Sequence, residues 1–174
     1  EDPHDVEVHR VETAEQMYSE THRHIGEVDI FIGAAAVSDY RPVDSAPQKI
    51  KKHKETMALN MIRSQDILAS VALLDHAPFT VGFAAETENV RDYARGKLEN
   101  KNLDMIVANR VGDNCGFDHD DNTVDVLWPN GEKVFPMMAK TELAQALIEL
   151  IAERFKLMRG GDTPPELSVV SSRD

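Results

Sequence analysis

Three continuous apolar runs constrain the fold of this chain more than any other feature. They are DIFIGAAAV at 29–37, FTVGFAAE at 79–86 and DMIVANRV at 104–111. Strands with apolar residues on both faces are typical of parallel sheets covered by helices on both sides. Segments with helical spacing separate the runs, so the sequence predicts an α/β fold: a Rossmann-like, three-layer domain built on a parallel sheet.

Apolar residues with helical spacing predict four helices, at 13–25, 64–74, 88–102 and 140–155. Thr13 stands three residues before Gln16, which is the spacing of a capping box. Ser64 is the expected cap of the second helix. These signals fix the order of helices and strands through most of the chain.

Two further segments read as strands. VEVHRV at 6–11 alternates between apolar and polar residues, which predicts a strand before the first helix. Within 123–137, two strand-like runs surround Pro-Asn-Gly, which is a hairpin signal. An antiparallel hairpin either extends the sheet or pairs with another subunit; we favour the second, because an exposed strand edge invites pairing. The sequence therefore predicts a C-terminal antiparallel hairpin used in dimerisation.

Length and composition indicate one soluble domain. The chain has 174 residues, of which 41% are apolar and 29% charged. No apolar run reaches the roughly 18 to 20 residues that span a bilayer, and the acidic N-terminus is unlike a secretory signal, so we expect a cytoplasmic protein. The formal net charge of −12 argues against binding to nucleic acid or to anionic membranes.

Candidate ligand-binding residues follow the predicted strands. Ligands of open α/β sheets bind outside the carboxyl ends of the strands, which here are followed by Gly33 to Asp39, Phe83 to Glu86, and Asn109. Small residues at 33–36 either admit a flat ligand close to the backbone or pack a helix tightly on the strand. Asp39 either accepts hydrogen bonds from ribose hydroxyls or caps the turn that follows.

Lysines form local positive patches in this acidic chain. Lys49, Lys51, Lys52 and Lys54 fall within six positions, and Lys97 and Lys101 are spaced four apart on a predicted helix. Such patches either bind a small anion or are simply solvated surface. The patterns GxGxxG and GxxxxGK[ST] do not occur in the sequence, so any phosphate site would differ from the usual glycine-rich cradles.

Other reactive residue types carry weaker signals. Cys115 is the only cysteine and has no adjacent base, which favours an incidental thiol. DHDDN at 118–122 imitates the start of an EF-hand loop, but Thr123 and Pro129 stand where a glycine and a glutamate belong, so we predict no metal site. The histidines, including His22, His24 and His76, show no ligand spacing and are assigned to the surface or to local hydrogen bonds.

Five blocks carry a family resemblance. AAAVSDYRP, APQKIKK, MALNMIRSQDIL, VGFAAET and KNLDMIVAN closely resemble, in this order, the phosphopantothenate–cysteine ligase family, in particular the bacterial CTP-dependent type. That ligase is one half of a bifunctional coenzyme A biosynthesis protein. The similarity spans roughly residues 6 to 155, and SQD at 64–66 stands where the family usually has Asn-Pro-Asp.

The resemblance also implies a domain organisation. The family's opening glycine-rich βα turn and asparagine-containing loop have no counterpart in the sequence. The expectation is a single ligase domain at 1–158 that lacks its N-terminal βα element, followed by a flexible tail at 159–174. A homodimer, with a flavin-dependent decarboxylase domain fused to the ligase, is the expected assembly.

The implied reaction joins 4′-phosphopantothenate to L-cysteine. CTP activates the carboxylate as an acyl-cytidylate with loss of pyrophosphate, and the cysteine amine then displaces CMP. Mg²⁺ is expected to bind through the phosphates. Lys49, with Lys51 or Lys52 as further candidates, would neutralise charge in the first step. Carried over position by position, the nucleotide-binding residues are Gly33, Ala34, Ala35, Asp39, Lys49, Gln65, Asp66, Ile67, Leu68, Phe83, Lys97 and Lys101.

Two other classes of function stay open. An NAD(P)- or flavin-dependent oxidoreductase would use the same type of sheet, but it would need a glycine-rich turn that this sequence does not contain. A non-catalytic dimerisation fragment would act through the segments 123–137 and 140–155. Preference for NADPH over CTP, or dimerisation without nucleotide binding, would distinguish these alternatives.

Overall fold

A five-stranded mixed sheet forms the centre of the protein. The computed structural model describes residues 4–44, 48, 55–111 and 121–160. The strand order is β1-β4-β5-β6-β7, in which the first three strands run parallel and the last two are antiparallel to their neighbours. Their bounds are β1 Ile30–Gly33, β4 Phe79–Glu86, β5 Met105–Arg110, β6 Asp121–Trp128 and β7 Gly131–Ala139.

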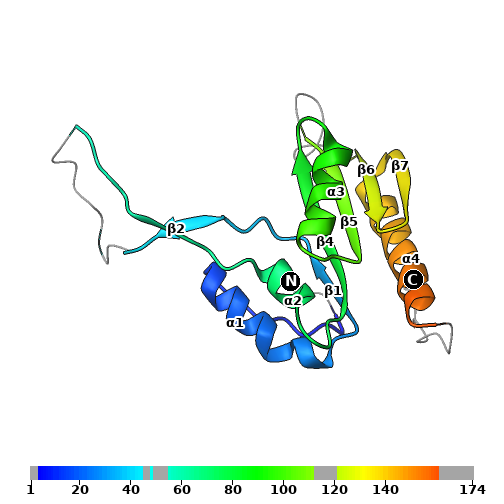
Figure 1. The fold of residues 1–174 in the computed structure, drawn as a ribbon, viewed down its shortest axis with the longest axis horizontal. Helices are drawn as coiled ribbons and strands as arrows, with labels where there is room; N and C mark the ends of the chain where they lie inside the picture. The colour runs from blue at the N-terminus through cyan, green and yellow to red at the C-terminus, as the bar shows by residue number, and fades with distance from the viewer. Residues whose placement is uncertain (1–3, 45–47, 49–54, 112–120, 161–174) are drawn as a thin grey trace.

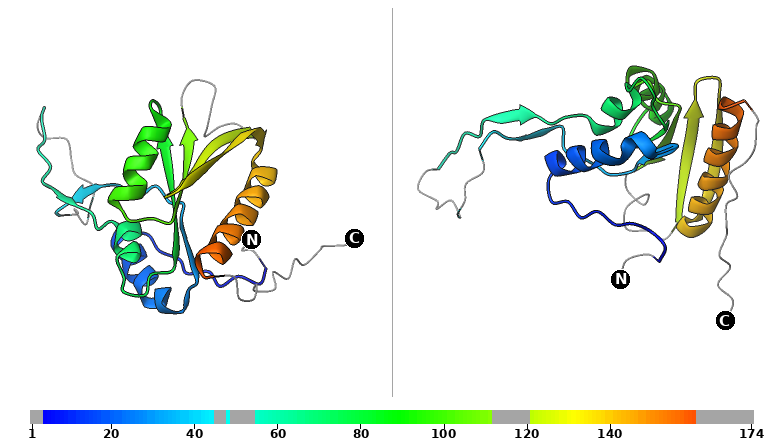
Figure 2. Two further views of the ribbon diagram at one scale, coloured as in Figure 1. Left: turned by 45° about the vertical axis from the view of Figure 1, so that its right-hand side comes forward. Right: turned by 90° about the horizontal axis from the view of Figure 1, so that it is seen from below.

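Helices cover both faces of this sheet. The α-helices are α1 (Ala14–His24), α2 (Ile67–Ala72), α3 (Val90–Asn100) and α4 (Lys140–Met158), and a 3₁₀ turn η1 (Ile25–Glu27) follows α1. Figure 2 shows α4 on one side of the sheet and α1, α2 and α3 on the other. The Rossmann-like, three-layer α/β prediction is therefore confirmed. None of the helices in the described ranges is long and apolar enough to cross a membrane.

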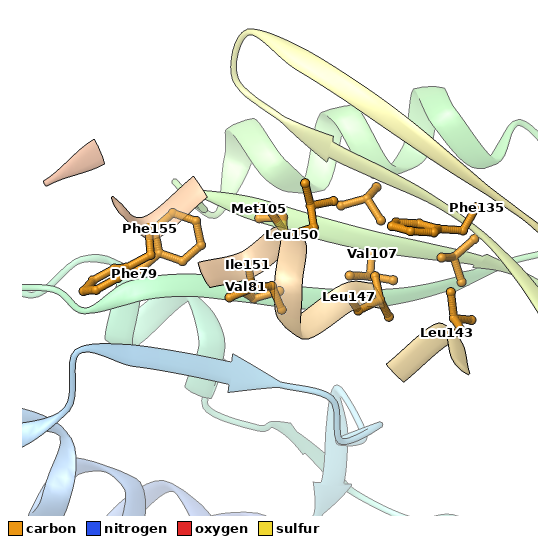
Figure 3. Packing of buried hydrophobic residues seen from close by; sticks show 12 residues of the cluster. Phe79, Val81, Met105, Val107, Phe135, Leu143, Leu147, Leu150, Ile151 and Phe155 are labelled. Atoms are coloured by element: carbon orange, nitrogen blue, oxygen red, sulfur yellow. The ribbon is translucent and has the colours of Figure 1, made fainter. Parts of the chain in front are cut away.

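Two apolar clusters hold the layers together. Between α4 and the sheet, Phe79 packs edge-to-face on Phe155, with 6.1 Å between ring centroids, while Met105 and Val107 meet the leucines of α4 (Figure 3). On the opposite face, Leu98 of α3 packs in a second cluster with residues of β4 and β5. The apolar runs that form β4 and β5 are thus largely buried from both sides, as parallel strands require, whereas β1 is only partly buried.

The helix starts follow local capping chemistry. Gln16 N donates to Thr13 Oγ1 at 3.1 Å and Thr13 N donates to Gln16 Oε1 at 3.2 Å, which confirms the capping box. The expected cap of the next helix, Ser64, is wrong. Asp66 caps α2 instead, accepting from Ala69 N at 3.0 Å, because the helix begins at Ile67 and only Asp66 stands at the position whose side chain reaches that amide.

The predicted strand at 6–11 is also wrong. These residues form no strand in the structure, and Val6 and Val8 are 59% and 42% exposed. Alternation predicts a strand only where a neighbouring strand pairs with it and one face is buried. Here the segment meets α1 through side chains: His9 Nδ1 lies 3.0 Å from Glu20 Oε1.

The predicted antiparallel hairpin is confirmed, and it forms the last two strands of the sheet. β6 and β7 pair from Trp128 opposite Gly131, and β6 pairs with β5, with Leu127 opposite Ile106. The hairpin therefore extends the sheet, and its use in dimerisation stays a prediction. Val126 and Leu127 are almost completely buried in the sheet, which explains why β6 joins β5.

An antiparallel ribbon projects from the body of the domain (Figure 1). It consists of β2 (Tyr40–Pro42) and β3 (Met61–Arg63), with Tyr40 opposite Arg63. All six residues are exposed, so the ribbon has no buried face. The sequence predicted only a loop here, and the lysine cluster at 49, 51, 52 and 54 lies outside the described residues, as do residues 161–174 of the predicted tail.

Candidate functional site

A cavity of about 290 Å³ lies where β1 and β4 end and α2 begins. The short α2 brings its first turn to this edge of the sheet, and α3 contributes long side chains from its last turn and its C-cap. The chain after β1 and the base of the projecting ribbon complete the wall. The lining residues are Met17, Phe31, Gly33, Ala35, Ala36, Val37, Ser38, Asp39, Arg63, Ser64, Gln65, Asp66, Ile67, Leu68, Phe83, Lys97 and Lys101.

Most residues that the sequence suggested for nucleotide binding meet at this cavity. Gly33, Ala35, Asp39, Phe83, the segment 65–68, and the lysines 97 and 101 all line it. Ala34 does not, Asn109 does not, and Lys49 lies outside the described residues. The structure therefore brings these candidates together in space, and their roles in binding stay predictions.

Glycines, rather than the alanines, let α2 approach the sheet. A Cβ on Gly33 would lie 3.2 Å from Leu68 Cδ1, and a Cβ on Gly82 would lie 2.7 Å from Leu68 Cδ2. Residues 34–36 are exposed, so the alternative that they pack tightly between helix and strand is wrong. Leu68 thus fixes the first turn of α2 over β1 and β4, and Ala35 and Ala36 are left exposed at the cavity.

Two lysines reach the cavity and are each paired with a carboxylate. Lys97 Nζ lies 2.6 Å from Glu86 Oε1, and Lys101 Nζ lies 2.8 Å from Asp66 Oδ2. Both pairs are partly exposed, so each contributes little to the stability of the fold. An anion entering the cavity would compete with these carboxylates for the two ammonium groups.

Asp66 is the most strongly engaged carboxyl in the cavity. Burial raises its pKa, but the hydrogen bond from the Ala69 amide, the hydrogen bond and charge of Lys101, and the charge of Arg63 outweigh burial and hold the pKa below its ordinary value. Asp66 is therefore ionised at neutral pH. The first amides of α2, at Ile67 and Leu68, have no acceptor within the helix and point toward its N-terminal end.

The sequence analysis did not assign several of the lining residues to the site. Arg63 adds a cation from the end of β3, and its signal was its position directly before the SQD segment. Ser64 Oγ is buried and, within the described chain, has no hydrogen-bond partner. Met17 and Phe31 are ordinary apolar residues of a helix and a strand, which carry no signal in a single sequence.

The structure also decides some of the weaker signals. Asp39 makes no side-chain hydrogen bond to a turn amide in the parts of the chain that are described, which removes the capping alternative. His22 Nε2 lies 2.9 Å from Ser70 Oγ, a local hydrogen bond as expected. His24 is exposed and bonds to Glu20 four residues earlier, again as expected, and both lie close to His9. Cys115, Asp118 and Asp120 lie outside the described residues.

The parallel strand ends, the helix start above them and the cavity between them define a Rossmann-like α/β domain with a ligand-sized site. The chain belongs to the family described as DNA/pantothenate metabolism flavoprotein C-terminal domain, whose model matches residues 1–155. This agrees with the resemblance found in the five sequence blocks.

Relatives with established names are bifunctional proteins. The chain is 44% identical over 155 residues to the coenzyme A biosynthesis bifunctional protein CoaBC of Haemophilus influenzae, covering 88% of this chain and 39% of that protein. It is 44% identical over 150 residues to the protein of the same name from Escherichia coli K12, covering 83% and 37%. The chain thus spans about two fifths of the length of these relatives.

Solved structures show the same fold. A crystal structure of the C-terminal domain of a CoaBC protein superposes with a TM-score of 0.65 and 32% identity, covering 86% of this chain and 65% of that one. The DNA/pantothenate metabolism flavoprotein of Streptococcus pneumoniae superposes with a TM-score of 0.70 at 20% identity, covering 88% and 74%. The second likeness supports the fold alone.

Proposed function

We propose that this domain acts in coenzyme A biosynthesis as a CTP-dependent ligase that joins 4′-phosphopantothenate to L-cysteine. The observation that carries the proposal is the cavity at the ends of β1 and β4, in a chain 44% identical to proteins named for coenzyme A biosynthesis. The cavity combines an aspartate, which can accept hydrogen bonds from a ribose, with cations that can bind phosphates. A nucleotide needs both kinds of group.

The residues divide naturally between the parts of a nucleotide. Asp39 would accept hydrogen bonds from the ribose hydroxyls, and Gly33, Ala34 and Ala35 would run along the nucleoside. Phe83 would contact the base. The amides of 65–68, with Lys97 and Lys101, would face the triphosphate. The volume of about 290 Å³ is near the lower end of the roughly 300–1,000 Å³ typical of ligand pockets, so part of the ligand would extend beyond the cavity.

Charge supports a phosphate ligand at this place. The whole chain carries a net charge of −12, which disfavours a polyanion, yet Arg63, Lys97 and Lys101 converge on one cavity. Arg63 makes no ion pair within the described residues, whereas the two lysines are held by carboxylates. A triphosphate that displaces those carboxylates would gain charge-assisted hydrogen bonds in return.

The proposed chemistry has two steps. The substrate carboxylate attacks the α-phosphorus of CTP, which forms the acyl-cytidylate and expels pyrophosphate; the cysteine amine then attacks the acyl carbon and expels CMP. Lys49 would neutralise charge on the phosphates in the first step. Its role rests on the family resemblance. Mg²⁺ would bind mainly to phosphate oxygens, because of the two aspartates that line the cavity Asp39 is assigned to the ribose and Asp66 accepts the hydrogen bond of Ala69 N.

The remaining expectations belong to the same proposal. We place the protein in the cytoplasm as a homodimer, with a flavin-dependent decarboxylase domain on the same polypeptide, in keeping with the bifunctional names of its relatives. β7 is the last strand of the sheet, so its outer edge offers one place for a second subunit.

Mass spectrometry of the reaction without cysteine tests the chemistry. The chain is incubated with 4′-phosphopantothenate, Mg²⁺ and either CTP or ATP. The proposal predicts an acyl-cytidylate with CTP and release of pyrophosphate in equal amount. Consumption of ATP in place of CTP would contradict the assigned nucleotide, and oxidation of added NADPH would favour the oxidoreductase alternative.

A further inference from the structure

A second group of polar side chains lies away from the cavity, where the N-terminal segment meets the end of α1. Glu20 and His24 stand one turn apart on α1, and His9 reaches them from the extended chain before the helix. His9 Nδ1 lies 3.0 Å and His24 Nε2 lies 3.1 Å from the same oxygen, Glu20 Oε1. The two imidazole rings are 4.4 Å apart between centroids.

We propose that His9, Glu20 and His24 form a binding site for one divalent transition-metal ion of the Zn²⁺ type. Their ligand atoms all lie within 4.8 Å of one another. Metal–ligand bonds of about 2.1 Å in tetrahedral geometry place neighbouring ligand atoms about 3.4 Å apart, so each of the two observed nitrogen–oxygen separations needs only a small adjustment. Water would complete the tetrahedron, since both histidines are at the surface.

Neighbouring charges orient two of the three ligands. Glu7 Oε1 lies 3.0 Å from His9 Nε2, so a proton held on Nε2 leaves the Nδ1 lone pair directed at the cluster. Arg23 contacts Glu20 Oε2 at 3.1 Å and Oε1 at 3.4 Å. Oε2 therefore satisfies most of the guanidinium contact while Oε1 faces the imidazoles. The Arg23 side chain is 68% exposed and is free to turn away when an ion binds.

The position of the cluster gives the ion a structural consequence. Glu20 and His24 are fixed by the helix, at its negative C-terminal end, which favours a cation. His9 belongs to the segment 6–11, which pairs with no strand in the described structure. An ion bound by all three would therefore tether that segment to α1. Two imidazoles and one carboxylate suit Zn²⁺, Cu²⁺, Ni²⁺ or Co²⁺ better than Mg²⁺ or Ca²⁺.

Calorimetric titration of the tag-free, chelator-treated protein with Zn²⁺ tests the site, and the visible absorption of bound Co²⁺ reports its geometry. We expect one ion per chain, the absorption of tetrahedral Co²⁺, and a rise in melting temperature on binding. His9→Gln and His24→Gln should each weaken binding at least tenfold. Glu7→Gln, which removes only the orienting carboxylate, should weaken it by about tenfold.

His76→Gln is the matched control, because His76 is exposed and lies outside the cluster. This variant should bind Zn²⁺ as the wild type does. Circular dichroism confirms that all variants keep the fold. Zn²⁺ binding that is absent, or that is equally strong in the His9 and His24 variants, would overturn the proposal and leave the cluster as a hydrogen-bonded network. The nucleotide proposal does not depend on this result.

Discussion

Lys101 Nζ donates to Asp66 Oδ2 at 2.8 Å, joining the C-cap of α3 to the N-cap of α2 in the wall of the cavity. The other Asp66 oxygen, Oδ1, accepts the hydrogen bond of the Ala69 amide. One carboxylate therefore caps a helix and holds a cation of the candidate nucleotide site at the same time. The two roles are separable, because an asparagine caps a helix without carrying charge.

Asp66→Asn and Asp66→Ala should differ in a way that separates these roles. Asparagine keeps the cap, so its unfolding free energy should stay close to that of the wild type, while alanine should lose about 1 kcal/mol. Loss of the charge frees Lys101, so both variants should bind CTP several-fold more tightly if the triphosphate lies beside it. Urea denaturation and calorimetry measure the two quantities. Equal stability of both variants would contradict the capping role.

The unfolding free energy should depend on pH through the ionisation of Asp66. Its folded pKa is lower than the ordinary value of 3.8, so the stabilisation is fully present above that value and is lost as the pH falls through the lower, folded pKa. The difference in unfolding free energy between wild type and Asp66→Asn should be constant from pH 7 to about pH 5 and should change below about pH 4. Urea denaturation across this range measures it; a difference that does not change with acid would contradict the shifted pKa.

Two glycine-to-alanine changes should shift the unfolding free energy in opposite directions. Gly96 lies inside α3 with nothing within 4 Å of an added Cβ, so Gly96→Ala should raise the unfolding free energy by up to about 1 kcal/mol. At Gly82 the added Cβ would lie 2.7 Å from Leu68 Cδ2 and 2.9 Å from Leu103 Cδ1. Overpacking of this kind costs about 1–3 kcal/mol, so Gly82→Ala should destabilise the fold.

A double variant checks the cause of the Gly82 effect. Leu68→Ala removes one of the two clashing side chains, so adding Gly82→Ala to it should cost less than adding Gly82→Ala to the wild type. Denaturant unfolding of the four proteins gives the coupling between the two positions. Additive effects would show that Leu68 does not limit the space beside Gly82.

Lys49→Gln should separate catalysis from folding. If Lys49 neutralises charge during formation of the acyl-cytidylate, the variant should form that intermediate at least a hundredfold more slowly, an effect of the size seen when one charge-stabilising group is lost. Its circular dichroism spectrum and melting temperature should match those of the wild type. Turnover close to normal would remove Lys49 from the mechanism.

Patterns within short stretches of sequence predicted those helices and strands that such a stretch determines by itself. The three apolar runs became β1, β4 and β5, which pair in parallel, and Thr13 caps α1 because its partner lies three residues away. The strand predicted for VEVHRV was wrong because the alternation of apolar and polar residues does not reveal whether a partner strand exists. The β2–β3 ribbon was missed because its residues are exposed on both faces and show no alternation of burial.

The residues of the candidate site also fall into two groups: those that the sequence predicted and those that only the structure brings together. Gly33, Phe83 and Asp66 were found because strand ends and helix starts are visible in the sequence. The pairing of Lys101 with Asp66 and the meeting of His9 with His24 join residues from different elements, and no periodicity records such contacts. Their detection needed the packing of α3 against the sheet and the path of the chain before α1.

Calorimetric titration with CTP, ATP and NADPH, with Mg²⁺ present, tests the central claim most directly. Lys97→Gln and Lys101→Gln remove the two cavity lysines, and Lys156→Gln removes an exposed lysine of α4, on the opposite side of the sheet, as a matched control. We predict that CTP binds in preference to ATP and NADPH, about tenfold more weakly in each cavity variant and unchanged in the control. Preferential binding of NADPH, or CTP affinity that is unchanged in both the Lys97→Gln and the Lys101→Gln variant, would contradict a CTP site at the ends of β1 and β4.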